Sequence, residues 1–294
     1  SDQMPLVGVN RSIVKWGLAA LNTTGRVGLN SLFEESGLKK GEINTYHVGF
    51  VIAPRINSMG RLAQGMDSLR LLCTTNRQRA RDLAEKLSLT NTERQEITRD
   101  TILHAIEGVE KRKVSLGNIL FVSHETYQQG VIGLVAGRLI EKYYLPSIVV
   151  SIGEIYSKAS ARSISGLNII EFIRGASDLL VDAGGHPMAA GFTVETTKLV
   201  LLQKKLEEMA LKQVTKKMLT RSLRIDCELP PDYITPQLYE AISDLEPFGM
   251  GNPMPVFASK NLIIEDLRVV GKDSKHLKFK LNSKNSDFRI DAIG

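Results

Sequence analysis

A long, highly charged stretch at residues 76–109 constrains this sequence more than any other feature. Its apolar residues recur every three to five positions, which is typical of a helix, but they form only a narrow stripe. Thr75 or Asn76 can cap its first turn. Because a helix this long and polar often bridges two domains, we expect a connecting helix over residues 73–112, with a boundary near residues 111–115.

Downstream of this helix, the hydrophobic pattern alternates between strands and helices. Four short runs predict strands and three amphipathic runs predict helices. In chain order, these segments are residues 119–123, 130–143, 147–151, 156–163, 168–180, 189–195 and 197–214. Alternation of this kind is typical of an α/β domain, which we assign, with its last helix, to residues 113–221.

The two flanking regions have different patterns. Residues 1–72 are mixed, and residues 53–62 are expected to form a loop because Pro54 and Gly60 interrupt them. Short helices are predicted there at residues 12–21 (with Ser12 as N-cap), 29–36 and 66–73. Residues 222–294 contain short, alternating strand-like runs, which predict a small β-barrel or sandwich that stops part-way through its pattern.

Composition narrows the class of protein. The formal net charge of +6 and a pI near 9.2 favour anionic partners such as nucleic acid, although only 6% of residues are aromatic and an extended base-stacking surface is not obvious. No apolar run is long enough to cross a bilayer, and no signal peptide begins the sequence. Cys73 and Cys227 are widely separated and are expected to be reduced thiols, so we expect a cytoplasmic protein with no membrane partner.

The sharpest local motif is Gly184-Gly185-His186 at the head of residues 184–191. Two glycines allow the backbone to approach a ligand closely, and their amides can bind an anion. His186 can then donate a hydrogen bond to a phosphate. The alternative interpretation is a tight turn that contains an incidental histidine.

Two further groups of residues have the chemistry of anion recognition. Ser160 and Arg162 face the same side of their predicted strand, where a hydroxyl and a planar guanidinium suit a phosphate or a carboxylate. Arg55, Asn57 and Arg61 lie in the predicted loop, where they could contact a phosphate backbone. A solvated edge strand and ordinary surface charge are the respective alternatives.

Several short segments, spread along the chain, give the sequence a family resemblance. Residues 184–191 resemble the signature of the DHHA1 domain of the DHH phosphoesterase superfamily. With residues 5–11, 53–62, 130–136, 160–163 and 246–253, they resemble the RecJ family of single-stranded-DNA-specific exonucleases over nearly the whole chain. The resemblance implies an α/β chain made of the end of a DHH domain (1–72), the connecting helix, a DHHA1 domain and a partial barrel of the oligonucleotide-binding (OB) type (222–294).

The resemblance also implies an activity and roles for particular residues. It implies a nuclease of DNA repair and recombination that degrades single strands from the 5′ end with two divalent ions, Mn²⁺ or Mg²⁺. Arg61 matches an arginine that contacts substrate, Ser160 and Arg162 match the pair that binds the 5′-terminal phosphate, and His186 matches the histidine that closes over the scissile phosphate. Asp2 is positioned like the last metal-binding aspartate of the DHH domain. No Asp-His-His triplet is present, so we expect a fragment cut at both ends that is inactive alone and holds no ion.

Two other functions remain open on the sequence alone. The chain could be a non-catalytic module that binds single-stranded nucleic acid, with a single-strand-binding protein or another repair protein as a partner. It could also be part of a phosphodiesterase acting on short oligonucleotides or cyclic dinucleotides, although such an enzyme is not expected to carry the Glu-Pro-Phe-Gly segment at residues 246–249.

Overall fold

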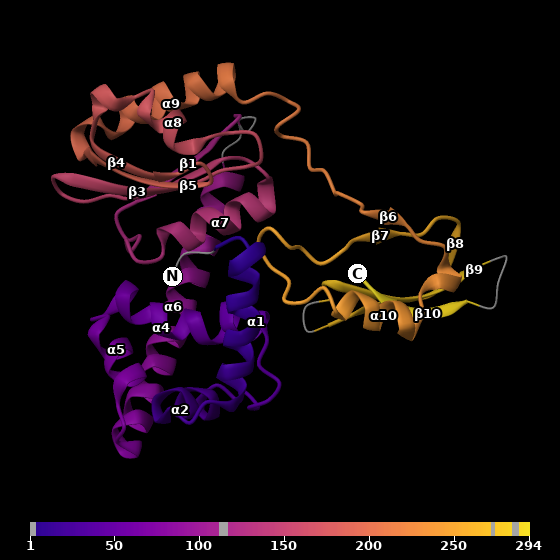
Figure 1. Ribbon diagram of the computed structural model, residues 1–294. Helices are drawn as coiled ribbons and strands as arrows, with labels where there is room; N and C mark the ends of the chain where they lie inside the picture. Colours follow the sequence, from indigo (N-terminus) through magenta and orange to yellow (C-terminus); the bar gives the residue numbers. More distant parts are fainter. Residues whose placement is uncertain (1–3, 112–116, 272–273, 284–287) are drawn as a thin grey trace. The chain divides into compact units, whose positions relative to one another are not determined.

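The computed structural model describes residues 4–111, 117–271, 274–283 and 288–294 (Figure 1). These residues form two compact units. The first spans Thr23–Ser222, and the second combines the described residues up to Asn22 with Leu223–Gly294. Most of the segment expected as a domain boundary, residues 111–115, lies outside the described residues.

The first unit begins with a cluster of helices that precedes the long helix α6 (Arg77–Glu110). In chain order they are α2 (Val27–Glu35), α3 (Thr45–His47), a π-helix at Val48–Ile52, α4 (Ala53–Leu62) and α5 (Met66–Cys73). Of these, α2, α4 and α5 pack against the first half of α6. The α6 residues buried in this half recur every three or four positions: Ala80, Ala84, Leu87 and Asn91. This spacing is the stripe expected of a helix with one packed face.

Helix α6 joins this helical cluster to a sheet domain, as the sequence predicts. Its first turn is capped by Asn76, whose Oδ1 accepts a hydrogen bond from the Arg79 amide at 2.9 Å. In its second half, Ala105 and Val109 are buried in a core shared with α7 (Ile132–Tyr143). One helix therefore has two buried stripes, one for each lobe of the unit, and fixes the lobes to one another.

A five-stranded sheet forms the second lobe of this unit. Its strands lie in the order β1-β2-β3-β5-β4, with only β1 and β2 parallel. Their bounds are β1 Leu120–His124, β2 Ser147–Ser151, β3 Tyr156–Arg162, β4 Leu180–His186 and β5 Ala189–Glu195. Helices α8 (Ile169–Arg174) and α9 (Leu199–Gln213) pack on one face, and α7 packs on the other (Figure 1).

Alternate side chains of the strands supply the two cores of this lobe. On β2, Ile148 and Val150 belong to the core beneath α8 and α9, whereas Val149 between them belongs to the core beneath α7. On β3, Ala159 and Ala161 also enter the α8–α9 core. Since strand side chains alternate in direction, Ser160 and Arg162 must project toward the α7 face.

Three local expectations from the sequence are wrong in this unit and in α1. Residues 53–62 form helix α4 and no loop, because the helix continues from the π-helix Val48–Ile52 through both Pro54 and Gly60, with Pro54 placed where the π-helix changes to an α-helix. The helix predicted at residues 168–180 ends at Arg174, and the strand β4 that follows was not predicted. Ser12 does not cap a helix, because α1 already begins at Gly8.

The described residues of the second unit form α1 (Gly8–Thr23) up to Asn22, short strands, a 3-10 turn at Pro231–Tyr233 and the helix α10 (Pro236–Ser243). A three-stranded antiparallel sheet is formed by β8 (Leu262–Val270), β9 (His276–Ser283) and β10 (Arg289–Ile293). A parallel pair, β6 (Cys227–Glu228) and β7 (Phe257–Ala258), and helix α10 precede it. Among the described residues these strands do not close into a barrel, so the OB-like expectation is met as a partial, open β-structure.

Residues 4–11 are bound to the C-terminal region within this unit. Arg11 Nη2 donates to the carbonyl oxygens of Leu245 at 2.8 Å and Glu246 at 3.1 Å. The Leu6 amide donates to the Met250 carbonyl oxygen at 2.6 Å. Segments that lie 234 to 244 positions apart in the chain thus share one set of hydrogen bonds.

A comparison of neighbouring leucines on α9 tests the packing of the sheet lobe. Leu202 is fully buried, whereas Leu201 beside it is 57% exposed. We expect Leu202→Ala to lower the free energy of unfolding by about 2–5 kcal/mol, because it removes apolar contacts and leaves a cavity. Leu201→Ala should change it by less than about 0.5 kcal/mol. Urea denaturation of both variants measures this, and equal losses would contradict the packing described.

Candidate functional site

The sheet register brings Ser160, Arg162 and His186 to one face of the sheet. Arg162 on β3 pairs with Ala189 on β5, and Ala189 pairs in turn with His186 on β4. Residues paired across strands project to the same side, and Ser160 is two positions before Arg162 on β3. Two strand spacings separate Arg162 from His186, a distance of about 10 Å. His186 itself is exposed.

The two glycines before His186 have different environments. Gly185 has φ +144°, and a Cβ there would collide with the backbone of Ala189 and Ala190, so the β4–β5 hairpin requires glycine at this position. Gly184 has open space where a Cβ would be and pairs with Gly191, which itself pairs with Ser160. The cross-strand row that contains Ser160 therefore has glycine on the next two strands, β5 and β4, so no side chain covers the sheet on that side of Ser160.

Arg162 is held from one side and keeps donors on the other. Its Nη1 donates to Ser160 Oγ at 3.0 Å and to the Ala161 carbonyl oxygen at 2.9 Å. For Nε and Nη2, the described residues provide no acceptor. Partial burial, and then the positive charge of Arg61, lower the pKa of Arg162, although a guanidinium remains charged at neutral pH. A half-buried cation with free donors is stabilised by a bound anion.

The first turn of α7 lies directly against this pair. A Cβ on Gly133 would stand 2.8 Å from Arg162 Nη2 and 2.9 Å from Ser160 Oγ, so a side chain at this position would displace these two groups. No side chain caps α7, and the Leu134 amide already donates to the Val131 carbonyl oxygen at 2.8 Å, which leaves the amides of Ile132 and Gly133 as the donors at this helix end. Amide donors, the positive end of the helix dipole, a hydroxyl and a guanidinium thus converge, which is the donor set of a phosphate or carboxylate site.

Arg61 adds a second cation from the helical lobe. It lies in the last turn of α4, and its Nη1 donates to the Gly130 carbonyl oxygen, 2.9 Å away in the turn that leads into α7. Its charge lowers the pKa of both Arg162 and Arg94. Three arginines from α4, α6 and β3 are therefore close enough to repel one another, which favours an anion among them.

Arg94 is a candidate binding residue that the sequence did not single out. It projects from α6, where its Nη2 donates to Asn91 Oδ1 at 3.0 Å, while its buried Nε has no partner among the described atoms. Burial is the larger cause of its lowered pKa, and Arg61 adds to it. On the sequence, Arg94 is one charge among many in a polar helix, so only the three-dimensional arrangement distinguishes it.

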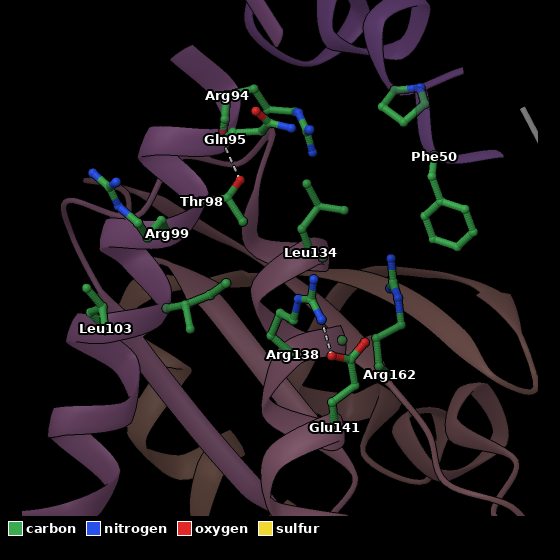
Figure 2. Close-up of a pocket in the computed structure, with 14 residues that line it drawn as sticks. Phe50, Arg94, Gln95, Thr98, Arg99, Leu103, Leu134, Arg138, Glu141 and Arg162 are labelled. Carbon is green, nitrogen blue, oxygen red and sulfur yellow. Dashed lines mark hydrogen bonds and ion pairs between the residues drawn. The ribbon is translucent and has the colours of Figure 1, made fainter. Parts of the chain in front are cut away.

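Arg94 and Arg162 border a groove of about 700 Å³ between α6 and α7 (Figure 2). Four arginines line the groove, whereas its single carboxylate, Glu141, is paired with Arg138. The lining residues are Phe50, Pro54, Arg94, Gln95, Thr98, Arg99, Ile102, Leu103, Gly133, Leu134, Gly137, Arg138, Glu141 and Arg162. The groove thus combines positive charge with an apolar floor.

Arg55 and Asn57 do not join this group. Arg55 Nε donates to Ser88 Oγ at 3.2 Å and its Nη1 to the Val51 carbonyl oxygen at 2.9 Å, so the side chain ties α4 to α6. Burial lowers its pKa, and the nearby charge of Glu35 opposes this effect. Neither Arg55 nor the half-buried Asn57 lines the groove. Residues 55 and 61 lie on a helix, and their separation of six positions directs them to different faces.

The described residues offer no set of ligands for a divalent ion. No group of three or more histidine, cysteine, aspartate or glutamate side chains converges within residues 4–111, 117–271, 274–283 and 288–294. Asp2, the metal ligand that the family resemblance implies, lies outside the described residues. In the described part of the chain, no helix is both long enough and apolar enough to cross a membrane.

Comparisons with protein families identify two domains in this chain. Residues 116–213 match the DHHA1 domain, and residues 225–294 match the RecJ OB domain. These are the domains that the sequence motifs imply for the sheet lobe and the C-terminal region.

Whole-sequence comparisons find relatives named single-stranded-DNA-specific exonuclease RecJ. The protein of Bacillus subtilis is 35% identical over all of this chain, and the protein of Thermus thermophilus is 32% identical over 96% of it. The chain covers only 37% and 40% of these two relatives. Crystal structures of Thermus thermophilus RecJ with Mg²⁺ and with Mn²⁺ are similar to it, with TM-scores of 0.82 and 0.83 at 31% and 30% identity. They match 95% and 99% of this chain and 42% and 44% of the solved chains.

Two glycines on α7 test the anion site. A Cβ at Gly133 would collide with Arg162 Nη2 and Ser160 Oγ and displace them, whereas a Cβ at Gly137, one turn later, meets nothing within 4 Å. Inorganic phosphate should stabilise the wild-type chain, by about 2 kcal/mol at 50 mM if the dissociation constant is near 1 mM. Gly133→Ala should lose this phosphate-dependent increment, and Gly137→Ala should keep it.

The increment is measured by urea denaturation in 50 mM phosphate and in a chloride buffer of equal ionic strength. Because each variant is compared with itself in the two buffers, any general effect of alanine on helix stability cancels. Equal increments in the wild-type chain and Gly133→Ala would place the phosphate elsewhere.

Proposed function

We propose that this chain, which carries a DHHA1 domain and a RecJ OB domain, supplies the substrate-binding part of a 5′-to-3′ single-stranded-DNA exonuclease. In this proposal the chain grips the 5′-terminal phosphate and the nucleotides that follow it. The observation that carries the proposal is the Ser160–Arg162 pair beneath the first turn of α7. The exonuclease names of the relatives agree with it.

The donors of the site suit a terminal phosphate better than an internal one. Arg162 presents Nε and Nη2, Ser160 presents its hydroxyl, and Gly133 in the first turn of α7 lies directly against both side chains. Arg61 and Arg94 add positive charge without occupying this position. A phosphate monoester carries between one and two negative charges at neutral pH, and a diester carries one. These positive charges therefore attract the 5′-terminal phosphate more strongly than an internal one.

His186 is suited to the next phosphate along the strand. It is on the same face of the sheet as Arg162, at a distance of about 10 Å across β5. That separation is too large for both side chains to hold one phosphate and is compatible with two successive ones. In the proposed complex, His186 donates a hydrogen bond to the phosphodiester that follows the terminal phosphate and so fixes the direction of the strand.

Hydrolysis itself is assigned to the intact enzyme. Solved relatives contain Mg²⁺ or Mn²⁺, and two such ions would activate a water molecule and stabilise the leaving oxygen. Because the described residues do not fit a divalent ion, no hydrolytic step is derived from them. Their contribution to the reaction is to hold the strand by its 5′ end.

A second candidate function is binding of single-stranded DNA without hydrolysis. The match of residues 225–294 to the RecJ OB domain favours it, because OB folds bind single strands through charged strand faces. Lys278 and Lys280 on β9 are more than half exposed, although Asp291 and Asp266 pair with them. A repair protein, such as a single-strand-binding protein, is the partner class that this unit would serve.

The 5′-end preference tests the proposal. The wild-type chain should bind a 5′-phosphorylated single strand more tightly than the same strand with a 5′-hydroxyl, as measured by fluorescence anisotropy in EDTA. Arg162→Ala should weaken binding of the phosphorylated strand by about 10- to 100-fold, the value of a charged hydrogen-bond pair, and abolish the preference. His186→Ala should weaken the binding of both strands by similar factors.

Arg138→Ala provides the matched control, because Arg138 lines the same groove but is ion-paired with Glu141. It should leave the preference for the phosphorylated end intact. In the intact enzyme, Arg162→Ala and His186→Ala should both slow metal-dependent degradation of a 5′-phosphorylated strand. An unchanged end preference in Arg162→Ala would refute the proposed role of this pair.

A further inference from the structure

Two large aromatic side chains are exposed beside the arginine groove. Tyr46 is 61% exposed and Phe50 is 70% exposed. Their rings stack on one another, with centroids 4.9 Å apart and planes inclined by 26°. A pair of exposed, parallel rings presents a flat apolar surface of the kind that is usually buried in a core or against a ligand.

The backbone holds this pair in a fixed place. Tyr46 lies in α3, and Phe50 lies in the π-helix Val48–Ile52 that continues from it. The segment begins with a reciprocal cap, in which Asn44 Oδ1 accepts from the His47 amide and His47 Nδ1 accepts from the Asn44 amide, each at 3.2 Å. The His47 ring also packs edge-on to Tyr46. Single π-helical turns are uncommon and frequently occur at functional sites.

Phe50 borders the groove that Arg162 and Arg94 line. Figure 2 shows its ring projecting toward the same open space as Arg162 and Leu134, across from Arg94 on α6. Phosphate donors on one wall and a flat aromatic ring on another match the two parts of a nucleotide, its phosphate and its base. A peptide carboxylate would use the cations but has no need of a stacked pair of rings.

We infer that Phe50, supported by Tyr46 behind it, is a stacking surface for one base near the 5′ end of a bound single strand. This inference rests on the proposed function and adds to it a base-binding residue. Every base has a π-face, so the contact is indifferent to sequence, as an exonuclease that moves along a strand requires. The groove then holds the strand by charge at the phosphate and by dispersion at the base.

The experiment compares strands that lack a single base. A 5′-phosphorylated 12-nucleotide strand and six versions with one abasic site, at positions 1 to 6, are titrated with the chain in EDTA and followed by fluorescence anisotropy. Phe50→Ala should weaken binding of the complete strand by roughly 5- to 150-fold, the range for one base stacked on an aromatic side chain. On one of the abasic strands this loss should disappear, because the base that stacks is already absent.

Three further variants separate stacking from general effects. Phe50→Trp should retain binding, and Tyr46→Ala should produce a smaller loss with the same abasic-site dependence. Leu89→Ala removes an exposed apolar side chain from α6 outside the groove and should leave binding unchanged. The salt dependence of binding should have the same slope in Phe50→Ala and the wild-type chain, because no phosphate contact is lost.

The outcomes distinguish the stacking surface from the proposed function. If Phe50→Ala binds like the wild-type chain, or if its affinity falls by the same factor for all seven strands, Phe50 does not stack on a base. If the Phe50 effect depends on one base but the wild-type chain ignores the 5′ phosphate, the end-binding proposal fails and the stacking surface stands. If the wild-type chain binds none of the strands, both are wrong.

Discussion

The structure of the candidate site depends on one close approach, between Gly133 at the start of α7 and the Ser160–Arg162 pair on β3. The missing Cβ of Gly133 lets a helix N-terminus lie against a guanidinium, although both are positive. Arg162 is partly buried, repelled by Arg61 and supplied with acceptors on one side only. An arrangement of this kind is unfavourable when empty and is relieved by an anion, which is the physical reason to assign it to binding.

Helix α6 makes this arrangement possible because it belongs to both lobes of the first unit. Its first half is packed by α2, α4 and α5, and its second half shares a core with α7. Arg61 at the end of α4 therefore reaches the turn before α7, and Phe50 reaches the groove beside Arg162. The site therefore combines Phe50 and Arg61 of the helical lobe with Arg162 of the sheet lobe, and α6 is the element that connects the two lobes. The groove also accounts for polar residues of α6, since Arg94, Gln95 and Arg99 line it from the exposed face of this helix.

The sequence predicted the elements with strong periodicity or clear caps. The connecting helix, its Asn76 cap and the strands at residues 147–151 and 189–195 are confirmed. Strand β4 escaped prediction because Leu180 and Val181 are followed by small and polar residues without alternation. Helix α4 differs from the prediction because Pro54 and Gly60 are typical loop signals, whereas here both lie in a helical run in which a π-helix directly precedes Pro54. Motifs identified Ser160, Arg162 and His186, and the register shows that they share a sheet face. Arg94 and Phe50 could not be identified, since their significance lies in what they face and not in local pattern.

The central claim is that Arg162 and Ser160 hold a 5′-terminal phosphate beneath the first turn of α7. The most direct measurement is a crystal structure of this chain with a short 5′-phosphorylated single strand, grown without divalent ions. The account predicts terminal phosphate oxygens within hydrogen-bonding distance of the Arg162 guanidinium, the Ser160 hydroxyl and an amide of the first α7 turn. A strand bound with its 5′ phosphate elsewhere, and with Arg162 still bonded only to Ser160 and Ala161, would contradict it.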